Sequence, residues 1–472
     1  MKQHSVIFTL AVLGIISVLT LSSFFKPNHH PSNLANDDQS IFNSNSKSTQ
    51  QRGNISLSTS FENDYYTRNH RQGHFYAELV SSKYSGNSEK YTPLNLSVVI
   101  DRSGSMAGDK IRNAKLAAKH IVDQMRPDDY LSIVIYDGTV DVLQSSITVN
   151  NKQLIKNKID QITDRGGTNL MGGALEGYAQ VKRHYQSNYI NRVLLMSDGL
   201  ANEGITDMKQ IERIIRSKSR VDGISISTFG VGRDYNEDLM TAMAESGNGN
   251  YYFIDHAEHI ASLFEKELHG LSQVIAQNAE LKITLPEYVN VDKVYGHRFE
   301  QSGRVLSIQF HDIFSEETKG VLIKYTVQSG KNTTVNFNTS LSYYDATEER
   351  TKSINLVNKN EYTTNENLYN SHFSEWVATQ VAIYESNETL ELAMKEVDNG
   401  RYEEAKKIVK KNEVYMKSKP QSIQNAPSVQ KATIINAEYD QKLDNVESMA
   451  SDEIKYMQKD TKNSNYKVRA KK

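Results

Sequence analysis

The chain contains no cysteine. This absence excludes a disulfide scaffold, thiolate metal sites and a thiol nucleophile. No residue of the sequence can carry the lipid that anchors bacterial lipoproteins through a cysteine. An excess of charge of one sign is absent as well, because 55 basic and 57 acidic residues give a formal net charge of -2. A nearly neutral chain gives no reason to expect nucleic acid as a partner.

Length and composition predict a folded chain of more than one domain. At about 150 residues per domain, 472 residues correspond to two or three domains. Hydrophobic residues make up 38% of the sequence and charged residues 24%, so apolar cores can form.

An apolar stretch near the N-terminus predicts export. Val6 to Phe25 contains no charged residue and follows Lys2. A helix of that length spans about 30 Å, the thickness of one hydrocarbon core. A cleaved signal peptide usually has a shorter apolar core and a small-x-small cleavage site, which Thr20-Leu21-Ser22 fits poorly. Residues 1–26 are therefore expected to be an uncleaved membrane anchor or a cleaved signal peptide. Both alternatives place the body on the periplasmic or extracellular side, or in the secreted fraction.

Strands and helices are predicted to alternate between residues 93 and 275. Leu96 to Ile100 and Leu131 to Ile135 are mostly apolar runs, as in strands buried on both faces. Between them, Asp109 to Arg126 places its apolar residues at helical spacing. The alternation continues through Val193 to Met196 and predicts an α/β domain with a doubly wound, mostly parallel, Rossmann-like sheet. Ligands bind such sheets beyond the carboxyl ends of the strands.

The segments on both sides of this domain predict a β-sandwich. Residues 27–56 are rich in Ser, Asn, Gln, Pro and His, which is typical of a flexible linker. In residues 276–360 apolar and polar residues alternate, as over Leu281 to Leu285, which indicates short antiparallel strands. Residues 57–92 contain similar stretches, and we expect them to join the same sandwich.

Helical periodicity returns over residues 361–457. A break at Asp398-Asn399-Gly400 separates two amphipathic stretches and predicts a helical hairpin or small bundle. Residues 458–472 hold several basic residues and, after Asp460, no acidic residue. They are predicted to form a solvated basic tail.

Three short segments rich in oxygen-bearing side chains follow strands or precede helices of the α/β region. Asp101-Arg102-Ser103-Gly104-Ser105 comes directly after the first apolar run, and Ser197-Asp198-Gly199 follows a later one. Gly166-Gly167-Thr168-Asn169 stands before a helical pattern. Since Asp101 and Asp198 both fall at the carboxyl ends of strands, we expect the three segments to meet.

The residue types in these segments suit a hard divalent cation. Mg²⁺ takes oxygen ligands in a nearly octahedral shell at about 2.0–2.1 Å. A turn can bring the hydroxyls of Ser103 and Ser105 to one cation, while Asp101 supplies charge directly or through water. Thr168 adds a hydroxyl from the second segment and Asp198 a carboxylate from the third. If the acids act through water, the cation still favours an anionic oxygen from a partner.

Each segment also has a purely structural explanation. Ser103 and Ser105 are good turn or N-cap residues, and Thr168 suits the cap of a helix that begins near Leu170. Asp198 taken alone is an ordinary loop acid. Their combination, in this order and at three loop tips, favours a divalent-cation site.

The segments resemble the metal-ion-dependent adhesion site (MIDAS) of von Willebrand factor type A (VWA) domains. The similarity extends over residues 94 to 275, and no element of the motif departs from the family's pattern. It implies a Mg²⁺ (or Mn²⁺) ion whose coordination shell is completed by an exposed Asp or Glu of a protein partner. The residues that the resemblance assigns to the metal are Asp101, Ser103, Ser105, Thr168 and Asp198.

The resemblance implies a non-enzymatic, metal-dependent protein-binding module for adhesion or scaffolding, similar to exported bacterial proteins with such a domain. Two alternatives stay open. The cation could only stiffen the loops of a structural or assembly protein, or it could serve a metal-dependent hydrolase. Against a hydrolase, the sequence has no Gly-x-Ser-x-Gly elbow, no His-Glu-x-x-His helix and no phosphate loop. No catalytic or organic-cofactor residue is predicted.

Overall fold

The computed structural model describes residues 44, 46–83, 92–232, 234–271 and 273–469. The predicted membrane anchor or signal peptide therefore lies outside the described residues, as does the first part of the predicted linker. Among the described residues, no helix combines the length and the apolar character needed to cross a bilayer.

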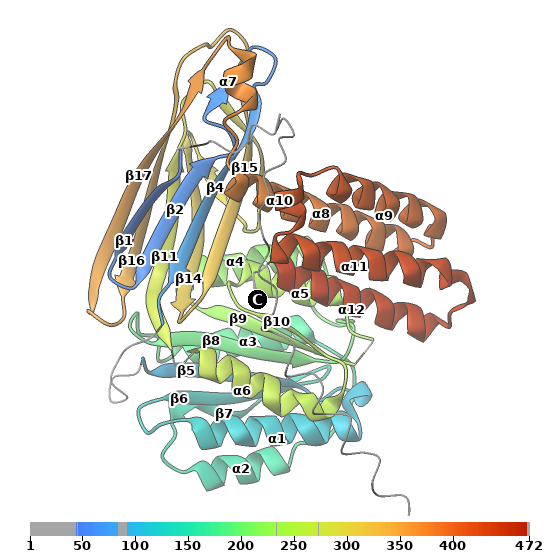
Figure 1. The fold of residues 1–472 in the computed structure, drawn as a ribbon. Helices are drawn as coiled ribbons and strands as arrows, with labels where there is room; N and C mark the ends of the chain where they lie inside the picture. The colour runs from blue at the N-terminus through green and yellow to red at the C-terminus, as the bar shows by residue number, and fades with distance from the viewer. Residues whose placement is uncertain (1–43, 45, 84–91, 233, 272, 470–472) are drawn as a thin grey trace, which may run out of the picture. The chain divides into compact units, whose positions relative to one another are not determined.

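A six-stranded sheet with the order β10-β9-β8-β5-β6-β7 forms the centre of the α/β domain (Figure 1). All neighbouring strands run parallel except β7, which pairs antiparallel with β6 at one edge. The strands are β5 (Leu94–Asp101), β6 (Tyr130–Tyr136), β7 (Val140–Thr148), β8 (Ile190–Ser197), β9 (Ser225–Val231) and β10 (Tyr251–Ile254). This arrangement confirms the predicted, mostly parallel α/β fold.

Helices cover both faces of this sheet. One face packs against α1 (Asp109–Gln124), α2 (Lys152–Asp160) and α6 (Ile260–Leu271). The other packs against α3 (Leu170–Lys182), α4 (Met208–Asp222) and α5 (Glu237–Ser246). Every residue of β5 is buried. The adjacent β5 residues Val98 and Val99 belong to the two cores on opposite faces of the sheet. A strand covered on both sides needs apolar side chains in both directions, which explains the continuous apolar run.

Two sheets form the predicted sandwich, with the orders β1-β2-β4-β15-β12 and β13-β14-β11-β16-β17-β3. Their strand pairs are antiparallel, except that β17 and β3 are parallel. The strands before the α/β domain are β1 (Ser48–Arg52), β2 (Ile55–Phe61), β3 (Tyr65–Tyr66) and β4 (Gln72–Ser81). Those after it are β11 (Val274–Thr284), β12 (Val289–Tyr295), β13 (Glu300–Ser302), β14 (Val305–Phe314), β15 (Thr318–Val327), β16 (Val335–Asp345) and β17 (Arg350–Tyr362).

The α/β domain is inserted into this sandwich. β4 precedes the domain and pairs with β15, which follows it, so that Tyr76 lies opposite Leu322. The rings of Phe61 and Phe337, from the two sheets, pack edge to face at 4.9 Å in the shared core. β1 lies inside the stretch predicted to be a linker. Its polar residues suit a solvated edge strand, where the hydroxyl of Thr49 lies 2.9 Å from that of Ser58 on β2.

The C-terminal part is helical, as predicted. Its helices are α7 (Glu366–Asn370), α8 (Glu375–Asp398), α9 (Tyr402–Lys417), α10 (Gln421–Gln424), α11 (Pro427–Asp444) and α12 (Ser451–Arg469). The turn between α8 and α9 contains Gly400 with a φ of 73°, a left-handed conformation that glycine adopts at little cost.

The segment predicted to be a solvated basic tail is instead largely helical, because α12 continues to Arg469. The basic side chains of α12 find partners on the α/β domain. Lys459 Nζ donates to the carbonyl of Tyr235 at 2.8 Å, and Lys462 Nζ donates to Asp238 at 3.1 Å. These partners come from a distant part of the chain, so the local composition of the tail could not indicate them.

Candidate metal centre

The three oxygen-rich segments meet at the carboxyl edge of the sheet. The loop after β5 is tied to the loop before α3 by two backbone hydrogen bonds. Gly104 N donates to Gly166 O at 3.2 Å, and Arg165 N donates to Arg102 O at 2.7 Å. β5 and β8 are adjacent parallel strands, with Ile100 opposite Met196, so the loops that follow them emerge side by side.

Four of the predicted ligands converge through their side-chain oxygens. The hydroxyls of Ser103 and Ser105 lie 3.1 Å apart, and Ser105 donates to Asp198 Oδ1 at 2.8 Å. A Cβ placed on Gly199 would lie 3.2 Å from Thr168 Oγ1 and 3.5 Å from Ser105 Oγ. Glycine at this position leaves room between the hydroxyls of the first and second loops.

The buried carboxylate of Asp101 anchors the first loop through hydrogen bonds. Its Oδ1 accepts a hydrogen bond from Ser103 N at 2.8 Å, and its Oδ2 accepts one from the Ser197 hydroxyl at 2.6 Å. The pKa of Asp101 is raised overall, chiefly by burial and also by the nearby charge of Asp198, although hydrogen bonds from Ser197 and Ser103 oppose the rise. Asp101 therefore orients the loop, and a cation bound beside it would favour its ionised form.

Four of the five predicted ligands are buried, and one is exposed to solvent. Asp101 and Asp198 are fully buried, Ser103 and Thr168 are almost so, and Ser105 is exposed. The structure thus brings all five predicted residues to one place, and Ser105 is the one of the five that is exposed to solvent.

The donor set fits a hard cation. Two carboxylates and three hydroxyls offer only oxygen, which is what Mg²⁺ and Mn²⁺ prefer. In the part of the chain that the structure describes, no three His, Asp or Glu side chains gather into a metal cluster. A cation at this edge would therefore depend on the serine and threonine hydroxyls.

An ion-pair network braces the loop that carries Thr168. Arg102 Nε and Arg165 Nε lie 2.8 and 2.7 Å from Asp137 Oδ2. Burial raises the pKa of Asp137, but hydrogen bonds from Arg165 and Thr139 and the charge of Arg102 outweigh it and lower the pKa to about 2. Asp137 is thus ionised under ordinary conditions and holds both arginines beside the site.

Three further residues lie at this edge of the sheet, and no sequence pattern predicted them. Asn202 Oδ1 accepts a hydrogen bond from Thr168 N at 2.9 Å. Glu203 covers Gly167 so closely that a Cβ there would lie 2.1 Å from Glu203 Oε1. Lys110, in the first turn of α1, also reaches the site. No residue spacing marks these positions in advance, because each depends on how a loop or helix packs.

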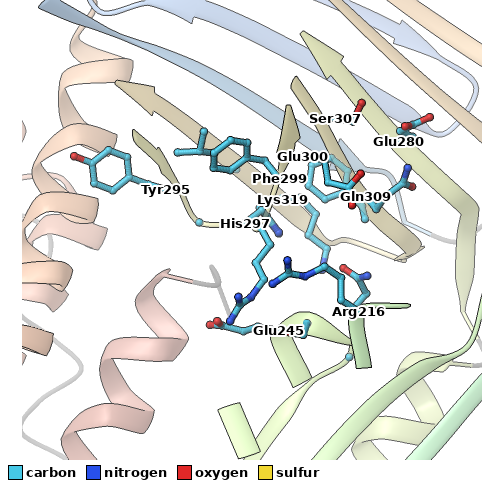
Figure 2. Close-up of a pocket in the computed structure, with 18 of the residues that line it drawn as sticks. Arg216, Glu245, Glu280, Tyr295, His297, Phe299, Glu300, Ser307, Gln309 and Lys319 are labelled. Atoms are coloured by element: carbon cyan, nitrogen blue, oxygen red, sulfur yellow. The ribbon is translucent and has the colours of Figure 1, made fainter. Parts of the chain in front are cut away.

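A separate cavity of about 480 Å³ is lined by Arg192, at the start of β8. Glu245 and Lys319 also line this cavity and are labelled in Figure 2. At about 3.3 Å per strand residue, Arg192 is roughly 20 Å from the loop that follows β8. Every arginine or lysine that the structure describes in its lining pairs with an acid of the chain, as Arg298 does with Glu212 at 2.8 Å. The cavity therefore presents no free cation to a ligand, and the three loops are the better candidate site.

Residues 95–266 match the sequence model of the von Willebrand factor type A domain. The chain therefore contains a VWA domain, which is the domain inserted into the sandwich. The match covers the three loops and both acidic residues of the candidate metal centre.

Relatives share this part of the chain. The uncharacterized protein YfbK of Escherichia coli (strain K12) is 34% identical over 217 residues, covering 45% of this chain and 38% of its own length. Inter-alpha-trypsin inhibitor heavy chain H1 of Bos taurus is 29% identical over 194 residues, covering 39% of this chain and 20% of its own length. The chain thus spans well under half the length of these relatives.

Two solved structures resemble more than the VWA domain. A von Willebrand factor type A protein from Catenulispora acidiphila has a TM-score of 0.65 at 14% identity, covering 82% of this chain and 91% of its own. The ArnB paralog VWA2 from Sulfolobus acidocaldarius has a TM-score of 0.60 at 16% identity, covering 88% and 98%. At these identities the likeness concerns the fold, and its extent includes elements outside residues 95–266.

Proposed function

We propose that this chain is a non-enzymatic protein-binding module that acts through a divalent cation. The cation, Mg²⁺ or Mn²⁺, would be held by the five residues Asp101, Ser103, Ser105, Thr168 and Asp198. The observation that carries the proposal is the convergence of three loops on one set of oxygen donors, with Ser105 open to solvent. When bound, the cation supplies an open position for an anionic oxygen, such as an exposed Asp or Glu of a partner.

The chain's own residues prepare this position. The hydroxyls of Ser103 and Ser105 lie next to each other, so two neutral ligands come from one turn. Asp198 accepts a hydrogen bond from Ser105 and sets the orientation of that hydroxyl. Because the hydroxyls add no charge, only the carboxylates of Asp101 and Asp198 among the five residues offset the charge of the cation.

Several observations support a binding role over catalysis. The described hydrogen-bond partners of the Ser105 hydroxyl are Ser103 and Asp198, whereas an activated serine usually faces a histidine or lysine base. One of the relatives given above is a chain of an inhibitor, which is in keeping with interaction between proteins.

A structural role is the second candidate. Asp101 and Asp198 are both fully buried at one edge, and a cation there would offset the cost of burying two carboxylates. In that case Mg²⁺ would stabilise the fold without recruiting a partner. We further propose that the body of the chain acts outside the cytoplasm, as the apolar Val6 to Phe25 stretch suggests.

The test uses the full chain in Mg²⁺ and in EDTA. Proteins captured from membranes in Mg²⁺ should elute with EDTA, and Asp101→Ala should capture none of them. Asp109→Ala is the matched control, because this acid is exposed on α1 and pairs with Arg112. Capture that ignores both EDTA and Asp101→Ala would contradict the proposed function. A Mg²⁺-dependent rise in melting temperature without any EDTA-sensitive partner would favour the structural role.

A further inference from the structure

One basic side chain of the chain itself reaches into the candidate metal centre. Lys110 Nζ lies 2.5 Å from Asp198 Oδ2 and 3.2 Å from the carbonyl oxygen of Ser105. Ser105 and Lys110 therefore hold the two oxygens of Asp198, one each. The resemblance to MIDAS motifs assigns no role to this lysine.

The packing around Lys110 keeps its ammonium group at this point. The lysine belongs to the first turn of α1, which begins directly after the loop that carries Ser105. Lys110 Nζ would lie 3.4 Å from a Cβ on Gly232, in the loop after β9. Its side chain is 29% exposed, whereas that of Asp198 is fully buried. The ammonium thus lies between a buried carboxylate and solvent, where a cation and its ligand would also lie.

Charge counting shows what such a group does to a cation site. Among the five predicted ligands, Asp101 and Asp198 contribute -2, and Lys110 contributes +1, so the predicted ligands and Lys110 together sum to -1. A divalent cation changes this sum to +1. Without the lysine the same loaded site would sum to zero. Opposite charges a few ångströms apart interact strongly where water is partly excluded, so one unit of charge matters here.

We propose that Lys110 places a fixed positive charge in the metal centre. This charge weakens cation binding and strengthens the capture of a carboxylate by the cation-loaded site. The inference rests on the proposed function, because it concerns the same cation and the same class of partner. Lys110 repels the arriving cation and competes for Asp198. Once the cation is bound, the same positive charge favours an anionic oxygen at the open position. Lys110 is thus a residue that tunes affinity, and it does not need to contact the metal.

The experiment compares full-length wild type with Lys110→Met and Lys110→Arg. Methionine keeps the apolar stem and removes the charge, and arginine keeps the charge. Calorimetric titration with Mn²⁺ and Mg²⁺ gives the metal affinity, and acetate added to the metal-loaded protein serves as the carboxylate probe. We expect Lys110→Met to bind the metal about tenfold more tightly or better, and to bind acetate correspondingly more weakly. Lys110→Arg should stay close to wild type in both measurements.

Lys110→Gln provides a second neutral variant should Lys110→Met fold poorly, since its amide can still donate to Asp198. Unchanged or weaker metal binding in a folded neutral variant would overturn the inference while leaving the proposed function intact. So would unchanged acetate binding. Metal binding that appears only after the lysine is neutralised would support the inference and contradict the proposed function for the wild-type chain. If neither wild type nor the neutral variants bind metal, both proposals fail.

Discussion

The hydroxyl of Ser105 donates a 2.8 Å hydrogen bond to the carboxylate of Asp198, although 93 positions separate them in the chain. The two loops meet because β5 and β8 pair in parallel with Ile100 opposite Met196. Sheet register therefore assembles the candidate metal centre, and changes at its loop tips can be tested separately from changes in the core.

Mg²⁺ should stabilise the chain against denaturation. A ligand that binds only the folded state adds about 2.7 kcal/mol to the free energy of unfolding at one hundred times its dissociation constant. Ser105→Ala should reduce this increment, because it removes one oxygen donor and the hydrogen bond to Asp198. Urea denaturation in Mg²⁺ and in EDTA measures the effect. Ser217→Ala, at an exposed position on α4, should retain the full increment.

Gly199→Ala should weaken metal binding without unfolding the domain. The new methyl group would lie 3.2 Å from Thr168 Oγ1, so this hydroxyl must shift, whereas Ser105 Oγ at 3.5 Å stays in ordinary contact. Crowding of this kind typically costs about 1–3 kcal/mol. Titration with Mn²⁺ gives the affinity. Gly270→Ala is the control, since a Cβ there meets nothing within 4 Å. Equal metal affinities of the two variants would contradict this account of the site.

Glu267→Gln should destabilise the α/β domain strongly. Glu267 on α6 lies 2.8 Å from Arg192, with both side chains 1% exposed, and it accepts hydrogen bonds from Ser227 and Tyr252. Removing one partner of a buried ion pair costs about 3–5 kcal/mol, because the other charge stays buried. Among the ion pairs that the structure describes, Arg192 would keep only the one with Asp312, at the longer distance of 3.5 Å.

Chemical denaturation of wild type and Glu267→Gln measures the change in the free energy of unfolding. Asp160→Asn is a suitable comparison, because Asp160 is 53% exposed in its ion pair with Lys119 and the pair should contribute little. A loss for Glu267→Gln no larger than that for Asp160→Asn would show that the buried pair does not support the fold.

The free energy of unfolding should fall as the pH rises, because Asp312 loses its proton. Burial raises the pKa of Asp312 to about 6, although the nearby charge of Arg192 opposes this. In the unfolded chain its pKa is near 3.9. Between these values the folded state binds more protons than the unfolded state, so the free energy of unfolding declines as pH rises from about 4 to about 6.

Asp312→Asn should remove this decline. Relative to wild type, the variant should gain up to about 3 kcal/mol across that interval, because each unit of pKa shift is worth about 1.4 kcal/mol. Urea denaturation at several pH values between about 4 and 7 measures the difference. A difference between variant and wild type that stays constant over the interval would rule out titration of Asp312 as its source.

The parts of the fold that the sequence predicts are those with a strong local pattern. Buried strands such as β5 and β6 show apolar runs because helices cover both faces of the sheet. The elements that were not predicted have weaker patterns. β7 is an edge strand with exposed residues at Asp141 and Val142, and α2 is a helix of nine residues. An edge strand or a short helix buries little, so its sequence carries little periodicity.

The sequence by itself determined which oxygen-bearing residues make up the candidate metal centre, their order along the chain and the strand ends that two of its loops follow, because these depend on residue type and local periodicity. Only the tertiary structure decided how closely Ser105 approaches Asp198, and that Lys110 shares this carboxylate. It also decided that the basic end of α12 packs on the α/β domain through Lys459 and Tyr235. These contacts join residues far apart in the chain. They depend on strand register and helix packing, which no local pattern of residues encodes.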